Sequence, residues 1–177
     1  GKSTLLSAIS ENKVDGFPDT NSVKCVFVQT DIIGEKSHLN CIEYILDDPK
    51  ISELGYSPEK VESSLLEYGF GNKTTNATAA AKVDNGVTTL SGGWRLKLAL
   101  VRAMLIKPDI LLLESPTDHL DVINIEWIEN YIRESNISII FTSQSKGTLN
   151  NCCTHIMQIK DLKLNIFDGN LDSLILK

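Results

Sequence analysis

Three small residues, Ser91, Gly92 and Gly93, could hold a phosphate group. They open a segment with a helical pattern, and the first amides of a helix have no partners inside it. Because two of the three residues lack side chains, an anionic oxygen can reach those amides, and the helix dipole favours negative charge there. A Ser-Gly-Gly turn alone is weak evidence, since a tight loop also uses glycine for its backbone conformation.

A second candidate phosphate site is the run Gly1-Lys2-Ser3-Thr4, which reads as the end of a P-loop. There Lys2 would place its ammonium between the β- and γ-phosphates, and Ser3 would ligate Mg²⁺. The alternative is an exposed terminal lysine without a ligand. A complete P-loop has five residues before Gly1 and a strand before those, so we expect the chain to be an N-terminally truncated piece of a longer protein.

The third candidate site follows an apolar strand. Residues Ile110–Leu113 are continuously apolar, which is typical of a strand buried on both faces of a parallel sheet. Glu114 and Ser115 come next, and the run 116–121 (Pro-Thr-Asp-His-Leu-Asp) follows them. A carboxylate at such a strand end can hold a metal-bound water. The order of the three sites along the chain is specific for a nucleotide-binding protein.

With these motifs, and with Val14–Pro18, Leu90–Ala103 and Leu162–Leu164, the chain resembles the ABC-F branch of ATP-binding cassette proteins, and within it the first cassette of the fungal-type translation elongation factor three. The resemblance extends over nearly the whole chain. It implies an α/β P-loop NTPase cassette, with a mostly parallel sheet flanked by helices and a helical subdomain. It also implies ATP and Mg as ligands, and a second cassette, on the same full-length chain, that packs head to tail with ATP between the two.

The resemblance assigns a role to the residues after the apolar strand. Glu114 takes the place of the Walker B aspartate, where it would anchor Mg²⁺. Ser115 takes the place of the catalytic glutamate, and Gln144 that of the switch histidine. A hydroxyl is not a base near neutral pH, and the loss of a positioned general base typically costs about 10² to 10⁴ in rate. We therefore expect ATP hydrolysis at this site to be weakened.

The other family positions are better preserved. Gly1, Lys2, Ser3 and Thr4 would bind the nucleotide, and Ser91, Gly92 and Gly93 form the signature loop that would contact the ATP of the second cassette, with Trp94 in place of the usual Gln. His119 and Asp121 belong to the D-loop, where we interpret His119 as an interface or capping residue. Gln29 stands one residue before the family's Q-loop position, and since such a shift turns a side chain to the other face of a strand, Gln29 is only a candidate nucleotide-binding residue.

The elements that would position these residues can be predicted from periodicity and capping signals. We expect 1–177 to be a single cassette that includes a helical signature subdomain over 39–105. Residues 71–89 lack the regular spacing of apolar residues that a helix or strand shows, which predicts a mobile linker. The predicted helices are 2–10, two within 39–68, 93–105, 121–134 and a short one near 149; the predicted strands are 25–28, 110–113, 137–142, 155–159 and 162–167. The second helix within 39–68 is expected to begin at Ser57 and Pro58, and strand 137–142 to be buried.

The composition limits the class of protein. At 177 residues and 42% hydrophobic content, the chain can bury one sizeable core. The four cysteines have no metal-ligand spacing and predict reduced thiols in a cytoplasmic protein. No apolar run approaches the about 18 residues of a membrane helix. The net charge of −6 argues against direct DNA binding, and any ribosome contact would be local or made by other domains.

These observations predict ATP binding and hydrolysis-linked switching in a soluble, ribosome-associated ABC-F factor. An alternative is a degenerate cassette that binds ATP without hydrolysing it and completes the site of its partner cassette. A third possibility is the nucleotide-binding domain of a membrane transporter. Membrane helices or a second cassette in the full-length protein would separate these classes.

Overall fold

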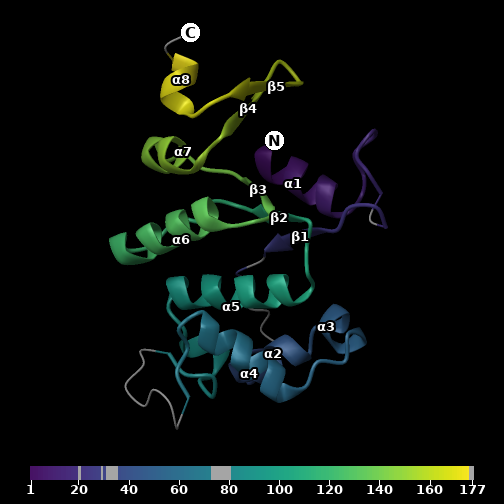
Figure 1. The fold of residues 1–177 in the computed structure, drawn as a ribbon, viewed down its shortest axis with the longest axis vertical. Coiled ribbons are helices and arrows are strands. Elements are labelled where there is room, and N and C mark those ends of the chain that lie inside the picture. Colours follow the sequence, from purple (N-terminus) through teal and green to yellow (C-terminus); the bar gives the residue numbers. More distant parts are fainter. Residues whose placement is uncertain (20, 29, 31–35, 73–80, 176–177) are drawn as a thin grey trace. The chain divides into compact units, whose positions relative to one another are not determined.

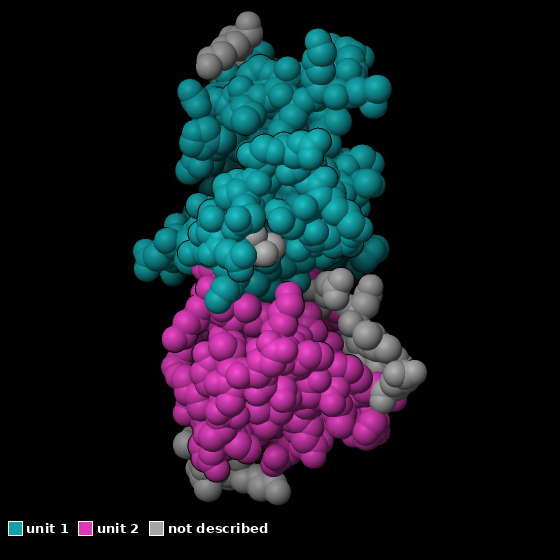
Figure 2. All heavy atoms as spheres, turned by 90° about the vertical axis from the view of Figure 1, so that its right-hand side faces the viewer, with its two compact units in different colours: residues 1–27, 109–177 teal, residues 28–108 magenta. Residues whose placement is uncertain are grey.

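The computed structural model describes all residues except 20, 29, 31–35, 73–80 and 176–177. The chain divides into two compact units (Figure 2), one of residues 1–27 and 109–177 and the other of residues 28–108. The first unit contains Gly1–Thr4 and the loop after residue 113. The second contains Ser91–Gly93 and the range 39–105, for which we predict the helical subdomain.

The first unit is built on a three-stranded sheet in the order β1-β2-β3. The strands are β1 (Cys25–Val28), β2 (Ile110–Leu113) and β3 (Ser138–Phe141). β2 and β3 are parallel, with Leu113 opposite Phe141. Leu111 and Leu112 are fully buried and Leu113 is 1% exposed, which confirms the prediction of a strand that is buried on both faces.

Two helices lie beside this sheet (Figure 1), namely α1 (Lys2–Ser10) and α6 (Val122–Glu134). In α1, Leu6 and Ile9 pack with Leu112 of the central strand. α6 begins at Asp121, whose carboxylate accepts a hydrogen bond of 2.8 Å from the backbone N–H of Asn124. This N-cap satisfies one of the free amides of the helix start, as the sequence predicts.

The C-terminal part of the first unit is a hairpin between two short helices. The elements are α7 (Lys146–Cys152), β4 (His155–Lys160), β5 (Lys163–Asp168) and α8 (Leu171–Ile175). β4 and β5 are antiparallel and are joined by Asp161 and Leu162, both at positive φ, so the predicted closing strands are confirmed to within a residue or so at their ends.

The second unit is helical, and its elements are α2 (Cys41–Leu46), α3 (Pro49–Glu53), α4 (Pro58–Glu67), the 3₁₀ helix η2 (Val87–Thr89) and α5 (Gly92–Leu105). Ser57 caps α4, with Pro58 at the first helical position, which confirms that prediction. We did not predict α3, although Asp48 and Pro49 give it the same start signal.

The structure corrects two of the sequence-based expectations. The predicted mobile linker 71–89 is wrong for the residues that the structure describes, because Ala81, Val83 and Val87 are at most 2% exposed within the helical core. Residues 73–80 of that range lie outside the described residues. β3 is only half-buried rather than buried. Among the described strands it pairs with β2 alone, so its other edge has no neighbour.

Candidate functional site

The first turn of α1 carries the candidate phosphate-binding residues. Gly1 is the N-cap, and its carbonyl accepts a hydrogen bond of 3.0 Å from the N–H of Leu5. Lys2, Ser3 and Thr4 are exposed, and the first turn contains no acidic residue. Free amides, one ammonium group and no competing carboxylate on this turn make it suited to an anion.

The loop after β2 is held by a polar residue that the sequence analysis missed. The N–H of Ser115 donates to the Thr142 hydroxyl at 3.0 Å, and the N–H of Thr142 donates to the Leu113 carbonyl at 3.0 Å. These bonds join the carboxyl ends of β2 and β3. Thr142 directly follows an apolar strand, and a polar residue at that position is the signal that could have identified it.

Ser115 has an unusual backbone conformation, with φ of +43°. Side-chain-bearing residues seldom adopt the left-handed region, so the surrounding contacts must hold it there. The carbonyl of Ser115 accepts the N–H of Asp118 at 3.0 Å, and Pro116 and Thr117 are buried. The loop is therefore well fixed although residue 115 offers no carboxylate.

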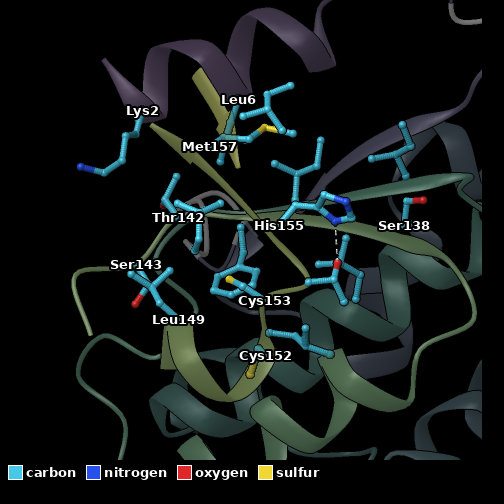
Figure 3. Close-up of a pocket in the computed structure, with 18 of the residues that line it drawn as sticks. Lys2, Leu6, Ser138, Thr142, Ser143, Leu149, Cys152, Cys153, His155 and Met157 are labelled. Carbon is cyan, nitrogen blue, oxygen red and sulfur yellow. Dashed lines mark hydrogen bonds between the residues drawn. The ribbon is translucent and has the colours of Figure 1, made fainter. Parts of the chain in front are cut away.

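Of the predicted site residues, only Lys2 lines the groove of the first unit, together with the polar residues at the end of β3. Lys2, Thr142 and Ser143 line one groove of about 900 Å³, and Figure 3 shows Lys2 at the start of α1 across from Thr142 and Ser143. Thr142 in turn bonds to Ser115, and Gln144, which is exposed, follows Ser143. The helix start and the end of β3 thus line one groove, and the loop after β2 is bonded to that strand end.

The structure places the remaining predicted site residues of the first unit, except for one that lies outside the described chain. Glu114 is exposed directly after β2, and Asp121 is the N-cap of α6. His119 is exposed, with φ of +61°. Gln29 lies outside the described residues, so the structure does not place it.

In the second unit, Ser91 is the N-cap of α5 and is exposed together with Gly92, whereas Gly93 is buried. Within the described part of the chain, the Ser91 side chain accepts no capping hydrogen bond, and the first turn of α5 has no acidic residue. The hydroxyl and the first amides are thus free of the usual cap. Arg95 is half-buried and donates to backbone carbonyls, so it is not part of a solvated face.

A magnesium ion fits the donors of the first unit only together with other ligands. No group of three or more His, Cys, Asp or Glu in the described ranges could hold a metal by itself. Ser3 and Glu114 are exposed and offer one hydroxyl and one carboxylate. Mg²⁺ is usually bound by one or two protein oxygens together with phosphates and water, so this pair is compatible with Mg-nucleotide.

The groove continues away from the phosphate-binding residues along β3. Apolar side chains of α1, β3, β4 and β5 line it, and Leu6 and Met157 face it in Figure 3. Cys152 at the end of α7 and Cys153 directly after it also line the groove. Burial raises the pKa of both thiols, that of Cys152 to about 11. Both thiols are therefore protonated at neutral pH.

The comparisons with known proteins agree with this geometry. Residues 1–118 match the family model described as ABC transporter. This chain belongs to that ATP-binding cassette family. Elongation factor 3 of Phytophthora infestans is 42% identical over 99% of the chain, and elongation factor 3 of Candida glabrata is 37% identical over all of it. The chain spans 16% of the length of each of these relatives, and the predicted resemblance is confirmed.

Solved structures confirm the α/β cassette fold. A nucleotide-free ATP-binding cassette from an ABC transporter superposes with a TM-score of 0.73 at 16% identity, over 100% of this chain and 80% of that one. A dimeric ATP-binding cassette in a post-hydrolysis state, bound to ADP and Pi, gives 0.66 at 18% identity over 95% of this chain and 80% of that one. Within the described ranges, every helix is too short or too polar to cross a membrane.

Proposed function

We propose that this chain is a cassette of an elongation-factor-3-like ABC-F translation factor that binds Mg-ATP and couples its hydrolysis to conformational switching at the ribosome, in the cytoplasm. One observation carries the proposal: Lys2 and the end of β3 line one groove of the first unit, and Thr142 at that strand end holds the loop of Ser115. The family match and the elongation factor 3 relatives support it.

Different residues of the first unit would bind the phosphates and the magnesium ion and lie beside the attacking water. Gly1–Thr4 would hold the phosphates through the amides and the Lys2 ammonium, and Ser3 and Glu114 would hold Mg²⁺. Bound Mg²⁺ would neutralise charge on the transferred phosphoryl group. Gln144 would hydrogen-bond the terminal phosphate, and Ser115 would lie beside the attacking water without acting as a base.

The second unit would act on a partner cassette of the same full-length chain, with Ser91–Gly93 contacting the γ-phosphate and His119 and Asp121 of the first unit belonging to the D-loop. The missing base favours an alternative in which this site binds ATP without hydrolysing it while the signature loop still completes the partner's site. A transporter domain is a third class, which the names of the elongation factor relatives disfavour.

We further propose that a strand upstream of Gly1 completes the cassette in the longer protein. Thr142 donates its N–H to β2, and since successive amides of a strand alternate in direction, the amides of Ile139 and Phe141 face the other edge of β3. Both residues line the apolar groove, where an extended segment could pair with them. Such a strand would lead into the first half of the P-loop.

Extending the chain by this strand and by five P-loop residues should strengthen ATP binding, because the added amides supply part of the phosphate cradle. We expect an affinity at least about tenfold higher in titrations with labelled ATP. Cys153 in the groove should also become protected from alkylation, with the Cys25 thiol as the internal control. Equal affinities and equal alkylation would contradict the upstream strand.

The function itself is tested with the full-length protein. Ribosomes should stimulate its ATP hydrolysis, and liposomes should not. Lys2→Ala should weaken the binding of labelled ATP at this cassette, whereas Lys107→Ala, an exposed lysine at the end of α5, should leave it unchanged. Hydrolysis that responds to a membrane and not to ribosomes would favour the transporter class.

A further inference from the structure

Arg95 turns back from the first turn of α5 toward the segment that precedes the signature loop. Its Nε donates to the Leu90 carbonyl at 3.0 Å, and its Nη2 donates to the Thr88 carbonyl at 3.2 Å. The two carbonyls stand at the end of η2 and directly before Ser91. One side chain thus fixes the backbone on the entry side of the loop.

A guanidinium group is suited to this task because its donors lie in a rigid plane and can reach two acceptors at once. Hydrogen bonds from a charged donor are about twice as strong as neutral ones. Val87 is fully buried and Leu90 is 6% exposed, so apolar contacts hold one side of the segment while Arg95 holds its polar side. Lysine has the same charge without the planar fork.

The exit side of the loop is fixed by Trp94, next to Arg95. Its ring meets Phe70 edge-on, with 4.8 Å between the centroids, and the Lys97 ammonium lies 4.4 Å from the centre of the Trp94 ring. Phe70 is 2% exposed and belongs to the helical core. Ser91 and Gly92 therefore lie exposed between two anchored segments, and their hydroxyl and amide groups need no reordering to meet an anion.

We infer that Arg95 is a positioning residue for the signature loop, which it holds in the conformation that contacts the nucleotide of a partner cassette. The inference rests on the proposed function and adds to it a residue that acts through the backbone of Thr88 and Leu90. Arg95 is not itself a phosphate ligand, because two of its three nitrogens are engaged by these carbonyls.

The experiment compares Arg95→Lys with Arg102→Lys in the full-length, two-cassette protein. Arg102 is on the same helix, and its guanidinium lies 3.8 Å from the Asp48 carboxylate, away from the loop. We expect Arg95→Lys to lower kcat for ATP hydrolysis at the partner site about tenfold, since a small displacement of a catalytic contact is costly. Binding of labelled ATP to the open protein should stay within about twofold, and Arg102→Lys should retain full turnover.

Hydrogen exchange distinguishes an effect of Arg95 on the signature loop from a general effect on the stability of the second unit. In Arg95→Lys, the hydrogen-bonded amides of Val87, Thr89 and Leu90 should exchange about tenfold faster, while those of α4 stay protected. Faster exchange throughout residues 39–105, unchanged turnover, or an equal loss in Arg102→Lys would each overturn the inference. If Gly92→Asp in the signature loop also retains full turnover, the proposed function fails rather than the role of Arg95 alone.

Discussion

The signature loop of the second unit and the loop after β2 of the first unit are both held by specific contacts, yet they differ in what they can do. Arg95 fixes the signature loop, and Ser91 with its glycines keeps the groups that an anion needs. Thr142 fixes the other loop, but residue 115 has no base. Because Thr142 bonds to the backbone of residue 115, the loop can keep its shape whatever the side chain.

Under the proposed function, this difference predicts that the cassette contributes more to hydrolysis at the partner's site than at its own. A neutral hydroxyl in place of a base weakens only the site that contains it. An intact signature loop stabilises charge on a nucleotide that another cassette holds. Substitutions in one loop at a time can therefore separate hydrolysis at this cassette's own site from the contribution of the signature loop to hydrolysis at the partner's site.

The largest effect is expected for Gly92→Asp, which would place a carboxylate against the partner's γ-phosphate. Removing one donor to a developing charge typically costs about 10² to 10³ in rate, and repulsion adds to that, so turnover at the partner site should fall at least about a hundredfold. Steady-state ATPase assays of the two-cassette protein measure it.

The structure argues that this loss would not come from unfolding. Gly92 is exposed at the first position of α5, where an acidic residue interacts favourably with the helix dipole. Ser115→Ala is the matched control, and it should leave the partner site nearly unchanged. Full turnover with Gly92→Asp would mean that this loop faces no nucleotide.

A smaller effect in the opposite direction is expected for Ser115→Glu, which restores a carboxylate beside the attacking water. We expect single-turnover hydrolysis at this cassette to rise about tenfold, below the full value of a general base. The gain is limited because Gln144, which lacks an imidazole, stands at the position of the switch histidine. Gln144→His should raise it further in the double variant. Fast hydrolysis with Ser115 unchanged would assign the base to another residue.

Much of the scaffold of both loops could be predicted from local signals. The apolar run Ile110–Leu113 predicts a buried strand, and Asp121 predicts the start of α6, because each signal depends on neighbours in sequence. Asp48 and Pro49 gave an equally local signal for α3, which we overlooked. The cassette fold was predicted from the family resemblance that these motifs carry.

The contacts that distinguish the two loops could not be predicted in the same way. The bond between Ser115 and Thr142 joins residues 27 positions apart, and it exists because β2 and β3 pair in parallel. The burial of Val83 and Val87 likewise depends on helices that are distant in sequence, and two valines in a polar stretch have no period to reveal it. Side-chain contacts between segments that are distant in sequence can be predicted only once the topology of the fold is known.

The smallest effect is expected for a substitution of Thr142, which tests whether this residue holds the loop after β2. Thr142→Val keeps the shape of the side chain but removes the acceptor of the Ser115 N–H, which should cost about 1 kcal/mol locally. Exchange of the Ser115 amide should then be about fivefold faster, measured by mass spectrometry of the peptide over β2 and its loop. Thr142→Ser keeps the hydroxyl and should exchange at nearly the original rate. If the valine variant exchanges no faster, the Thr142 bond does not hold this loop, and its shape must depend on buried Pro116 and Thr117 instead.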